Sequence, residues 1–192
     1  MNVERVKTIL LFMGPVAIAS AVIWIGAAIA INPTFDFFSG ALSQLGSPGA
    51  NAPWVYNTGL IFTSILLFLF SVSLLLNSKN KIESSGSSFL MITSLFLALI
   101  GIYHGGTYPH DFVSLWFFVL ADISIFAWGV GLLFDVFWHG VYVLILVCSA
   151  TILGFGISWQ SSAELETFGT AAISVWAVLM FIFYFKSSKL QK

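Results

Sequence analysis

Long runs of apolar residues alternate with short polar segments along this chain. Crossing the apolar core of a bilayer as an α-helix takes roughly 20 such residues. Runs of about this length have approximate bounds of 8–31, 55–77, 87–103, 111–134, 140–158 and 167–185. They are continuous and contain scattered Gly, Ala and Ser, which suits helix packing in lipid, whereas a β-barrel would show alternating segments of about ten residues. The pattern predicts an all-α, polytopic integral membrane protein, a single membrane domain over 1–192 built as a bundle of six transmembrane helices.

The polar segment between the first two runs has a helical periodicity of its own. At about 100° per residue, Phe35, Phe38, Leu42 and Leu45 share one side, and Asp36, Ser39, Ser43 and Gln44 share the other. We therefore expect an amphipathic helix over about 34–46, on the outer face. It would lie in the membrane interface with its phenylalanines among the acyl chains, or fold over the bundle as a lid with the polar side inward.

The distribution of charge predicts the orientation of the helices in the membrane. Only 8% of the residues are charged and 59% are hydrophobic, whereas a soluble domain has about 25% charged residues. All Lys and Arg residues flank the runs on one predicted side: Arg5, Lys7, Lys79, Lys81, Lys186, Lys189 and Lys192. The positive-inside rule then places both termini in the cytoplasm of a multi-pass protein in the cell (plasma) membrane.

Composition also excludes several classes of function. The net charge is -1 and there is no basic run that would follow a phosphate backbone, so no nucleic-acid partner is expected. Cys148 is the single cysteine, which excludes intramolecular disulfides, Cys-based zinc clusters and CxxC redox chemistry. The sequence identifies no cofactor, and membrane lipids are the expected partners.

The outer face carries the candidate chemistry, because its acidic and histidine residues have no Lys or Arg beside them. They are Asp36, His104, His110, Asp111, Glu164 and Glu166. If a metal binds, its ligands would be His104, His110 and Asp111, although their spacing matches no specific metal motif. A catalytic set can instead be assembled from a serine such as Ser43, a histidine, and Asp36 or Asp111. Tyr108 and His104 of the same turn, and Ser114 after it, are further candidate binding residues.

Asp122 lies inside the fourth run, roughly 16 Å below Asp111 at 1.5 Å per residue. On a helix it shares one face with Asp111, Ser114 and Phe118. A carboxylate at this depth costs at least about 2.5 kcal/mol, so we expect it to face the bundle interior with a neutral partner and to carry a proton. The candidate partners are Asn57, Ser64, Ser71, Thr93, Ser94, Ser149, Thr151, Thr170 and Ser174.

Two blocks of the chain resemble a known family. "NPTFDFFSGALSQLGSPGANAPWVYNTGLIFTSIL", from Asn32, is similar to the signature of the membrane family called domain of unknown function 998, with S-x-L-G, W-V-F/Y-N and a glycine-leucine start to the second helix. "LFLALIGIYHGGTYPHDFVSLWFF" is similar to its second block, in which a helix ends in G-I-F or G-I-Y and a histidine opens the next. The matching positions are Ser43, Leu45, Gly46, Trp54, Asn57, Gly59, Gly101, His110 and Ser114.

The resemblance implies a six-helix fold and a prokaryotic, archaeal or bacterial membrane, and it implies no activity. It also separates the two histidines. Relatives often have a Pro and an acidic residue where Tyr103, His104 and Gly105 stand here, and an acidic residue where Gln44 stands. His110 is therefore the better candidate for a functional residue than His104.

Two hypotheses of function remain open. In the first, a hydrolase- or transferase-like site acts on a lipid or amphiphile at the outer face. His110 is its base or a ligand, Asp111 or Asp36 orients His110, and Ser43 is the nucleophile or binds the substrate. In the second, the protein is a non-catalytic binding, transport or scaffold protein with a polar pocket around Asp122 and Asn57. A transporter of 192 residues would need to form a homo-oligomer.

Overall fold

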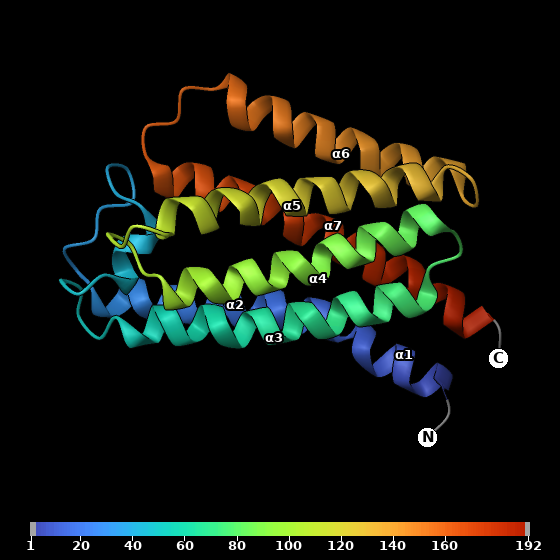
Figure 1. The fold of residues 1–192 in the computed structure, drawn as a ribbon, viewed down its shortest axis with the longest axis horizontal. Helices are drawn as coiled ribbons and strands as arrows, with labels where there is room; N and C mark the ends of the chain where they lie inside the picture. Colours follow the sequence, from blue (N-terminus) through green and yellow to red (C-terminus); the bar gives the residue numbers. More distant parts are fainter. Residues whose placement is uncertain (1–2, 191–192) are drawn as a thin grey trace.

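The structure is a computed structural model that describes residues 3–190, with side chains described to residue 187. Over this range the elements are α1 (Val3–Leu11), α2 (Met13–Ile31), the 3-10 helix η1 (Leu42–Gly46), α3 (Trp54–Asn77), α4 (Lys81–Ile102), α5 (His110–Leu132), α6 (Phe137–Gly156) and α7 (Ser162–Leu190). Figure 1 shows the long helices running roughly side by side, with both chain ends at the same end of the bundle.

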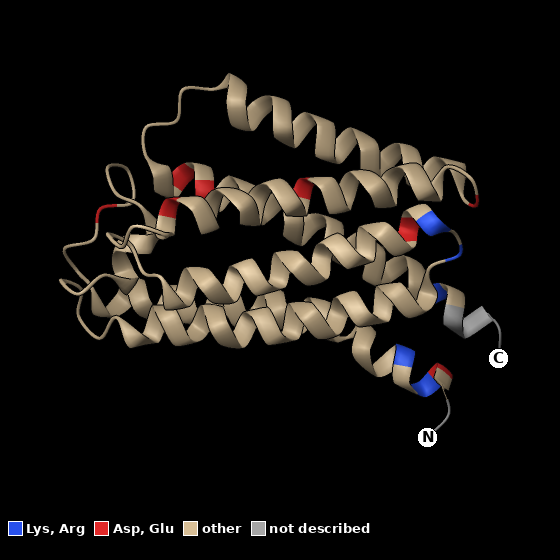
Figure 2. Cartoon of the chain, viewed as in Figure 1, with Lys and Arg blue, Asp and Glu red and all other residues tan. Residues whose placement is uncertain are grey.

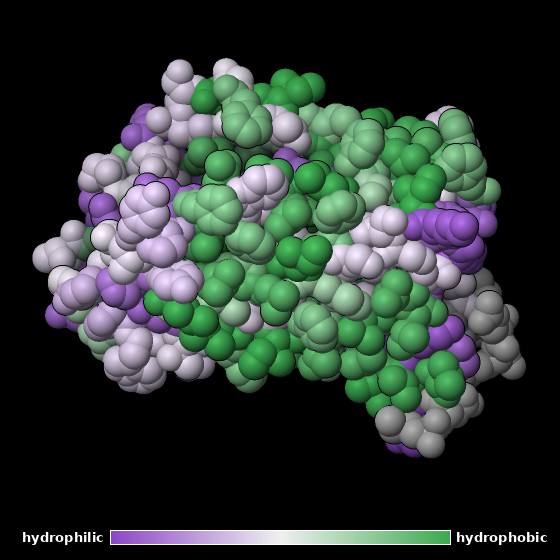
Figure 3. Space-filling view, viewed as in Figure 1, coloured by the Kyte–Doolittle hydropathy of each residue, from purple (hydrophilic) through white to green (hydrophobic). Residues whose placement is uncertain are grey.

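The predicted fold class is confirmed. Six helical segments in the described range are long and apolar enough to cross a membrane: α1 with α2, and each of α3 to α7. Within residues 3–190 there is no strand. The surface in Figure 3 has an apolar middle between two polar ends, as a protein surrounded by lipid requires.

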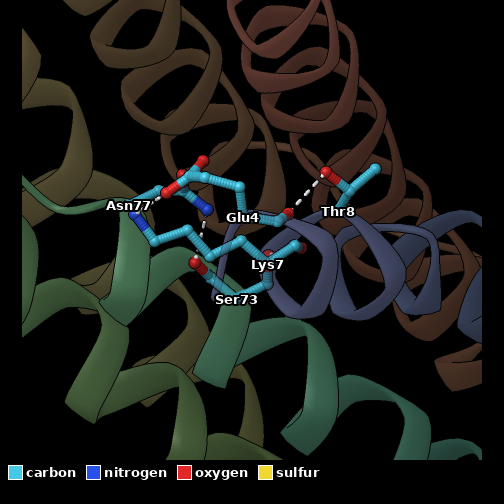
Figure 4. A network of polar contacts seen from close by, with 5 residues as sticks. All are labelled: Glu4, Lys7, Thr8, Ser73 and Asn77. Atoms are coloured by element: carbon cyan, nitrogen blue, oxygen red, sulfur yellow. Dashed lines mark hydrogen bonds and ion pairs between the residues drawn. The ribbon is translucent and has the colours of Figure 1, made fainter. Parts of the chain in front are cut away.

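The first span, predicted over 8–31, is divided into two helical segments. α1 ends at Leu11 and α2 starts at Met13. Pro15 has no N–H to donate to the carbonyl of Leu11, and its ring crowds that carbonyl, so the helix breaks one turn earlier. α1 then packs on α3, where the Ser73 hydroxyl donates to the Lys7 carbonyl at 2.8 Å (Figure 4).

α4 and α7 begin earlier than their apolar runs predicted, because polar residues cap them. α4 starts at Lys81 rather than 87: the Asn80 side chain accepts from the Ile82 and Glu83 amides at 3.1 and 3.0 Å. α7 starts at Ser162 rather than 167, after Ser161, whose hydroxyl accepts from the Glu164 amide at 3.1 Å. These are N-cap interactions, and hydropathy alone does not register them.

The helix predicted over 34–46 forms only in its last part, and this prediction was wrong for residues 34–41. Residues 33–40 form turns and bends, and only η1 is helical. The Asp36 carboxylate accepts from the Phe38 amide at 3.0 Å and from the Ser39 hydroxyl at 2.7 Å. Such a local side-chain turn competes with the helix for the same backbone groups.

The segment nevertheless covers the end of the bundle, with its apolar side inward rather than its polar side. Leu42 and Leu45 are only 5% and 1% exposed, whereas Phe38 is 63% exposed. η1 contacts α2, α3 and α7. Of the polar side, Ser43 is buried and Gln44 is exposed. The leucines therefore hold the segment down as a cap over the helix ends.

Close packing of the spans depends on glycines that face large side chains. A Cβ added at Gly59 of α3 would lie 2.4 Å from the Cβ of Trp24 on α2, and one at Gly86 of α4 would lie 2.8 Å from the Trp128 ring on α5. Small residues of this kind let helices approach closely in lipid. Gly26, also on α2, has open space where a Cβ would stand.

We predict that Gly59→Ala lowers the free energy of unfolding by about 1–3 kcal/mol, because the new methyl group overpacks the α2–α3 contact. The matched substitution Gly26→Ala should leave the free energy of unfolding unchanged or raise it by up to about 1 kcal/mol, because alanine favours the helical conformation more than glycine does. Thermal unfolding in one detergent measures both. Equal destabilisation by the two variants would contradict the packing account.

Candidate functional site

The two ends of the bundle differ in charge. Figure 2 shows the Lys and Arg residues at the end that also holds both termini, which we call the basic end. The opposite end holds Asp36, Asp111, Glu164 and Glu166 and, within the described part of the chain, no Lys or Arg; we call it the acidic end. Connections 32–53, 103–109 and 157–161 all lie there.

His110 is the first residue of α5 and is only 6% exposed. Its Nδ1 lies 2.7 Å from the Tyr103 carbonyl oxygen, and its Nε2 lies 3.4 Å from the Ser114 hydroxyl. Because a carbonyl oxygen only accepts, Nδ1 carries the proton in this contact. In a neutral ring Nε2 is then an acceptor that faces Ser114, a half-buried residue one turn further along α5.

The other members of the predicted catalytic set are at the acidic end but make no described contact with the His110 ring. Asp36 is exposed, and the Ser39 hydroxyl and then the Phe38 amide lower the pKa of its carboxyl below the ordinary value. It is therefore ionised and engaged within its own turn, which makes it a weak base. Asp111 is exposed on the first turn of α5.

Ser43 lies where two loops meet, but the hydrogen bond between the loops comes from Ser47. The Ser47 hydroxyl lies 3.3 Å from the Ser43 carbonyl oxygen and 3.0 Å from that of Gly105. A Cβ at Gly105 would stand 2.9 Å from the Ser43 carbonyl, so this contact requires a glycine. Segment 41–47 and the α4–α5 connection thus meet directly. The predicted catalytic set requires more, because the hydroxyl of Ser43 does not reach His110 in a described hydrogen bond.

The predicted metal ligands do not converge. Among residues 3–190 no three His, Cys, Asp or Glu side chains are placed to hold a metal ion. The Nδ1 of His104 lies 3.0 Å from the Gly105 carbonyl, and that of His110 is bound to Tyr103. Tyr108 is fully exposed and lines an open surface depression with Asp111 and Phe112.

Asn57 and Asp122 do not share a pocket. The Asn57 amide donates to the Gly46 carbonyl at 3.0 Å, near the start of α3, and its buried oxygen has no hydrogen-bond partner in the described chain. Asp122 lies roughly 18 Å along α5, at 1.5 Å per residue, where its carboxyl oxygen is 3.0 Å from the Thr151 hydroxyl of α6. Of the candidate partners for Asp122, the structure thus selects Thr151. Asn57 instead holds η1 in place.

The remaining candidate partners are engaged within their own helices. The hydroxyls of Ser64, Ser71, Thr93, Ser94, Ser149, Thr170 and Ser174 each donate to a carbonyl three or four residues earlier. Such bonds satisfy a hydroxyl in an apolar environment without a second helix. In the described structure these hydroxyls, including Ser64 and Ser71 of the second span, therefore have partners other than Asp122.

The interactions that hold segment 34–46 were missed by sequence reasoning. The Leu42 amide donates to the Glu166 carboxylate at 2.8 Å, the Ala163 amide to the Gly40 carbonyl at 3.0 Å, and the Ser161 hydroxyl to the Phe37 carbonyl at 2.7 Å. All three bonds link the segment to the first turns of α7. The capping pattern S-x-x-E at 161–164 was the available signal for this helix start.

We expect Glu166→Ala to release this segment, because it removes a charged acceptor from a backbone amide. Amide hydrogen exchange at Leu42 should become about tenfold faster, with a smaller effect in Glu166→Gln, which retains a weaker acceptor. Asp111→Asn serves as a matched control at the same end and should leave Leu42 unchanged. Unaltered exchange at Leu42 in Glu166→Ala would show that the leucine contacts alone hold the segment.

Taken together, the fold and the polar end loops define an all-helical membrane protein with six potential spans. The family described as "Protein of unknown function (DUF998)" matches residues 15–182, a range that includes every candidate site residue. The chain belongs to this family, which confirms the resemblance seen in the sequence. No curated protein and no solved structure shows a significant match to it.

Proposed function

We propose that the protein acts on a lipid or another amphiphile, with a hydrolase- or transferase-like site at the acidic end. The observation that carries this proposal is the His110 ring, which is anchored at Nδ1 and directs Nε2 toward the Ser114 hydroxyl. A base held by one group and facing a hydroxyl with its other nitrogen is the arrangement that activates a serine. In the absence of a substrate such contacts are often longer than in the working complex, which fits the 3.4 Å distance.

The chemistry that this pair supports is group transfer through Ser114. The Ser114 oxygen would attack a carbonyl carbon or phosphorus atom, and its proton would pass to Nε2 of His110. The imidazolium would then return the proton to the leaving oxygen as that bond breaks, and water or an alcohol would release the transferred group by the same route. The Tyr103 carbonyl and the neighbouring Asp111 charge would both stabilise the imidazolium.

The position of Ser114 favours an amphiphilic substrate. It lies roughly 6 Å into α5 at 1.5 Å per residue, and Phe112, Leu115 and Trp116 beside it are exposed on the protein surface. In a bilayer these side chains would contact lipid, so a headgroup at this depth would lie beside the hydroxyl. We place this end outside a prokaryotic cell membrane, with both termini cytoplasmic, because the described Lys and Arg residues are at the other end.

The site differs from the sequence hypothesis in one role. Ser114, first considered a binding residue, replaces Ser43 as the candidate nucleophile, because it is the hydroxyl within reach of His110. Asp36 and Asp111 make no hydrogen bond to the ring in the described structure, and the Tyr103 carbonyl takes the orienting role.

A serine-directed fluorophosphonate probe tests this proposal without a known substrate. We expect labelling of the purified protein at Ser114, lost in Ser114→Ala and reduced about a hundredfold or more in His110→Gln, since a positioned base contributes at least about this factor. Ser43→Ala should label normally. Matched elution and unfolding profiles of all variants exclude misfolding as the cause of a loss. If Ser114→Ala labels like the parent protein, the catalytic proposal fails.

A second candidate function rests on the contact between Asp122 and Thr151. Thr151 has a single hydroxyl proton, and its oxygen is 2.9 Å from the Val147 carbonyl as well as 3.0 Å from the Asp122 carboxyl. If the proton goes to Val147, the contact requires a proton on Asp122. A carboxyl that exchanges a proton between two spans would suit a non-catalytic, proton-coupled binding or transport protein.

Proton flux in liposomes distinguishes the two candidates. The transport alternative predicts protein-dependent flux that falls to the leak of protein-free liposomes in Asp122→Asn and is unaffected in His110→Gln. The catalytic proposal predicts no protein-dependent flux in either variant. Thr151→Val is the control for the contact itself and should reduce flux less than Asp122→Asn, because the carboxyl remains.

A further inference from the structure

α6 is the least enclosed span of the bundle. It buries the smallest share of its residues among the six spans, and the buried ones are Gly140, Val143 and Val147, which lie on one narrow face. Its contacts are mainly with α5, and its contact with α7 is smaller. The side of α6 that faces α7 is therefore incompletely filled.

A groove of about 350 Å³ occupies this space in the half of the bundle toward the basic end. This volume is within the range of pockets that hold small ligands, about 300–1,000 Å³. Its inner lining is apolar and comes from α5, α6 and α7: Leu132, Val143, Leu179, Met180, Ile182 and Phe183. Leu179 and Ile182 are also exposed on the protein surface, so the groove opens sideways toward the surrounding lipid.

Polar side chains surround the groove at the end of α7. Lys186 and Ser187 come from α7, and His139 and Tyr142 from the start of α6. In the described part of the chain, Lys186 forms no ion pair and the His139 ring has no hydrogen bond; its described contact is the Phe183 ring, 4.7 Å between centroids. Two acidic residues at the same end, Asp135 and Glu83, form no described ion pair with Lys186 or His139.

We infer that this groove binds an anionic phospholipid from the leaflet at the basic end. An acyl chain lies between α6 and α7 against Leu179 and Phe183, and the phosphate meets the Lys186 ammonium, with His139 and Tyr142 as hydrogen-bond donors. The groove matches the two parts of such a lipid: its lining within the membrane is apolar, as an acyl chain requires, and the membrane surface at its end carries the cationic Lys186. A basic pocket between spans on this side suits an anionic headgroup.

A second copy of the chain fits the groove less well. α6, the exposed span that borders the groove, has no acidic residue along Phe137–Gly156. A dimer packed along this span would thus bring no carboxylate of α6 itself to Lys186, whose charge would lose water without gaining a partner from that helix. A phosphate supplies the missing negative charge. This inference is independent of the proposed chemistry at His110, which lies at the opposite end of the bundle.

Native mass spectrometry of the detergent-purified full chain, with added phosphatidylglycerol or phosphatidylcholine of the same acyl chains, tests the site. We expect phosphatidylglycerol to be retained in preference to phosphatidylcholine. Lys186→Gln should weaken retention of phosphatidylglycerol about fivefold, since one cationic side chain near an anionic lipid contributes about 1 kcal/mol, and Lys186→Arg should restore it. Lys81→Gln, an exposed lysine at the same end, is the matched control and should have little effect.

Leu179→Trp provides a test that does not depend on charge. It enlarges a partly exposed lining residue and should reduce retention of both lipids while the unfolding temperature is maintained. Equal retention of the two lipids by the parent protein, or an equal loss in Lys81→Gln and Lys186→Gln, would overturn the inference. A lipid-free dimer that Leu179→Trp dissociates would also overturn it, because the occupant would then be a second copy.

Discussion

A bilayer offers no water to the backbone, so each N–H and C=O group of a spanning segment must find its partner within the protein. Helices meet this requirement for the backbone, and the same constraint governs the side chains between them. Hydroxyls such as those of Ser71 and Thr93 donate to carbonyls of their own helices. Other polar groups find their partner on a neighbouring helix: the Ser124 hydroxyl of α5 donates to the Gly86 carbonyl of α4, and the Asp122 carboxyl contacts the Thr151 hydroxyl of α6.

The same constraint explains the acidic end, where helices stop and their terminal amides and carbonyls become available. The first turns of α7 take up segment 34–46 through Ser161, Ala163 and Glu166, while the Tyr103 carbonyl that follows α4 binds the His110 ring. Residues that satisfy helix ends therefore also position the candidate site. This double role accounts for why His110 is buried although it stands at the very start of a span.

Sequence reasoning succeeded for spans and failed for details that depend on individual hydrogen bonds. The six apolar runs and the family were correctly predicted, because length, hydropathy and ordered motifs are local properties. The helix over 34–41 was wrong because periodicity does not show that the Asp36 side chain closes a turn on Phe38 and Ser39. Thr151 was among several possible partners of Asp122, and only the rotation of α6 against α5 selected it.

By itself the sequence determined that this chain is an all-helical membrane protein with its cations at one end and His104 and His110 at the other, because hydrophobic runs and charges act without regard to tertiary contacts. The tertiary structure decided which hydroxyl faces His110, which residues hold the end segment, and that α6 leaves a groove beside α7. These depend on distances of a few ångströms between residues far apart in the chain. Packing sets such distances, and no local pattern in the sequence records them.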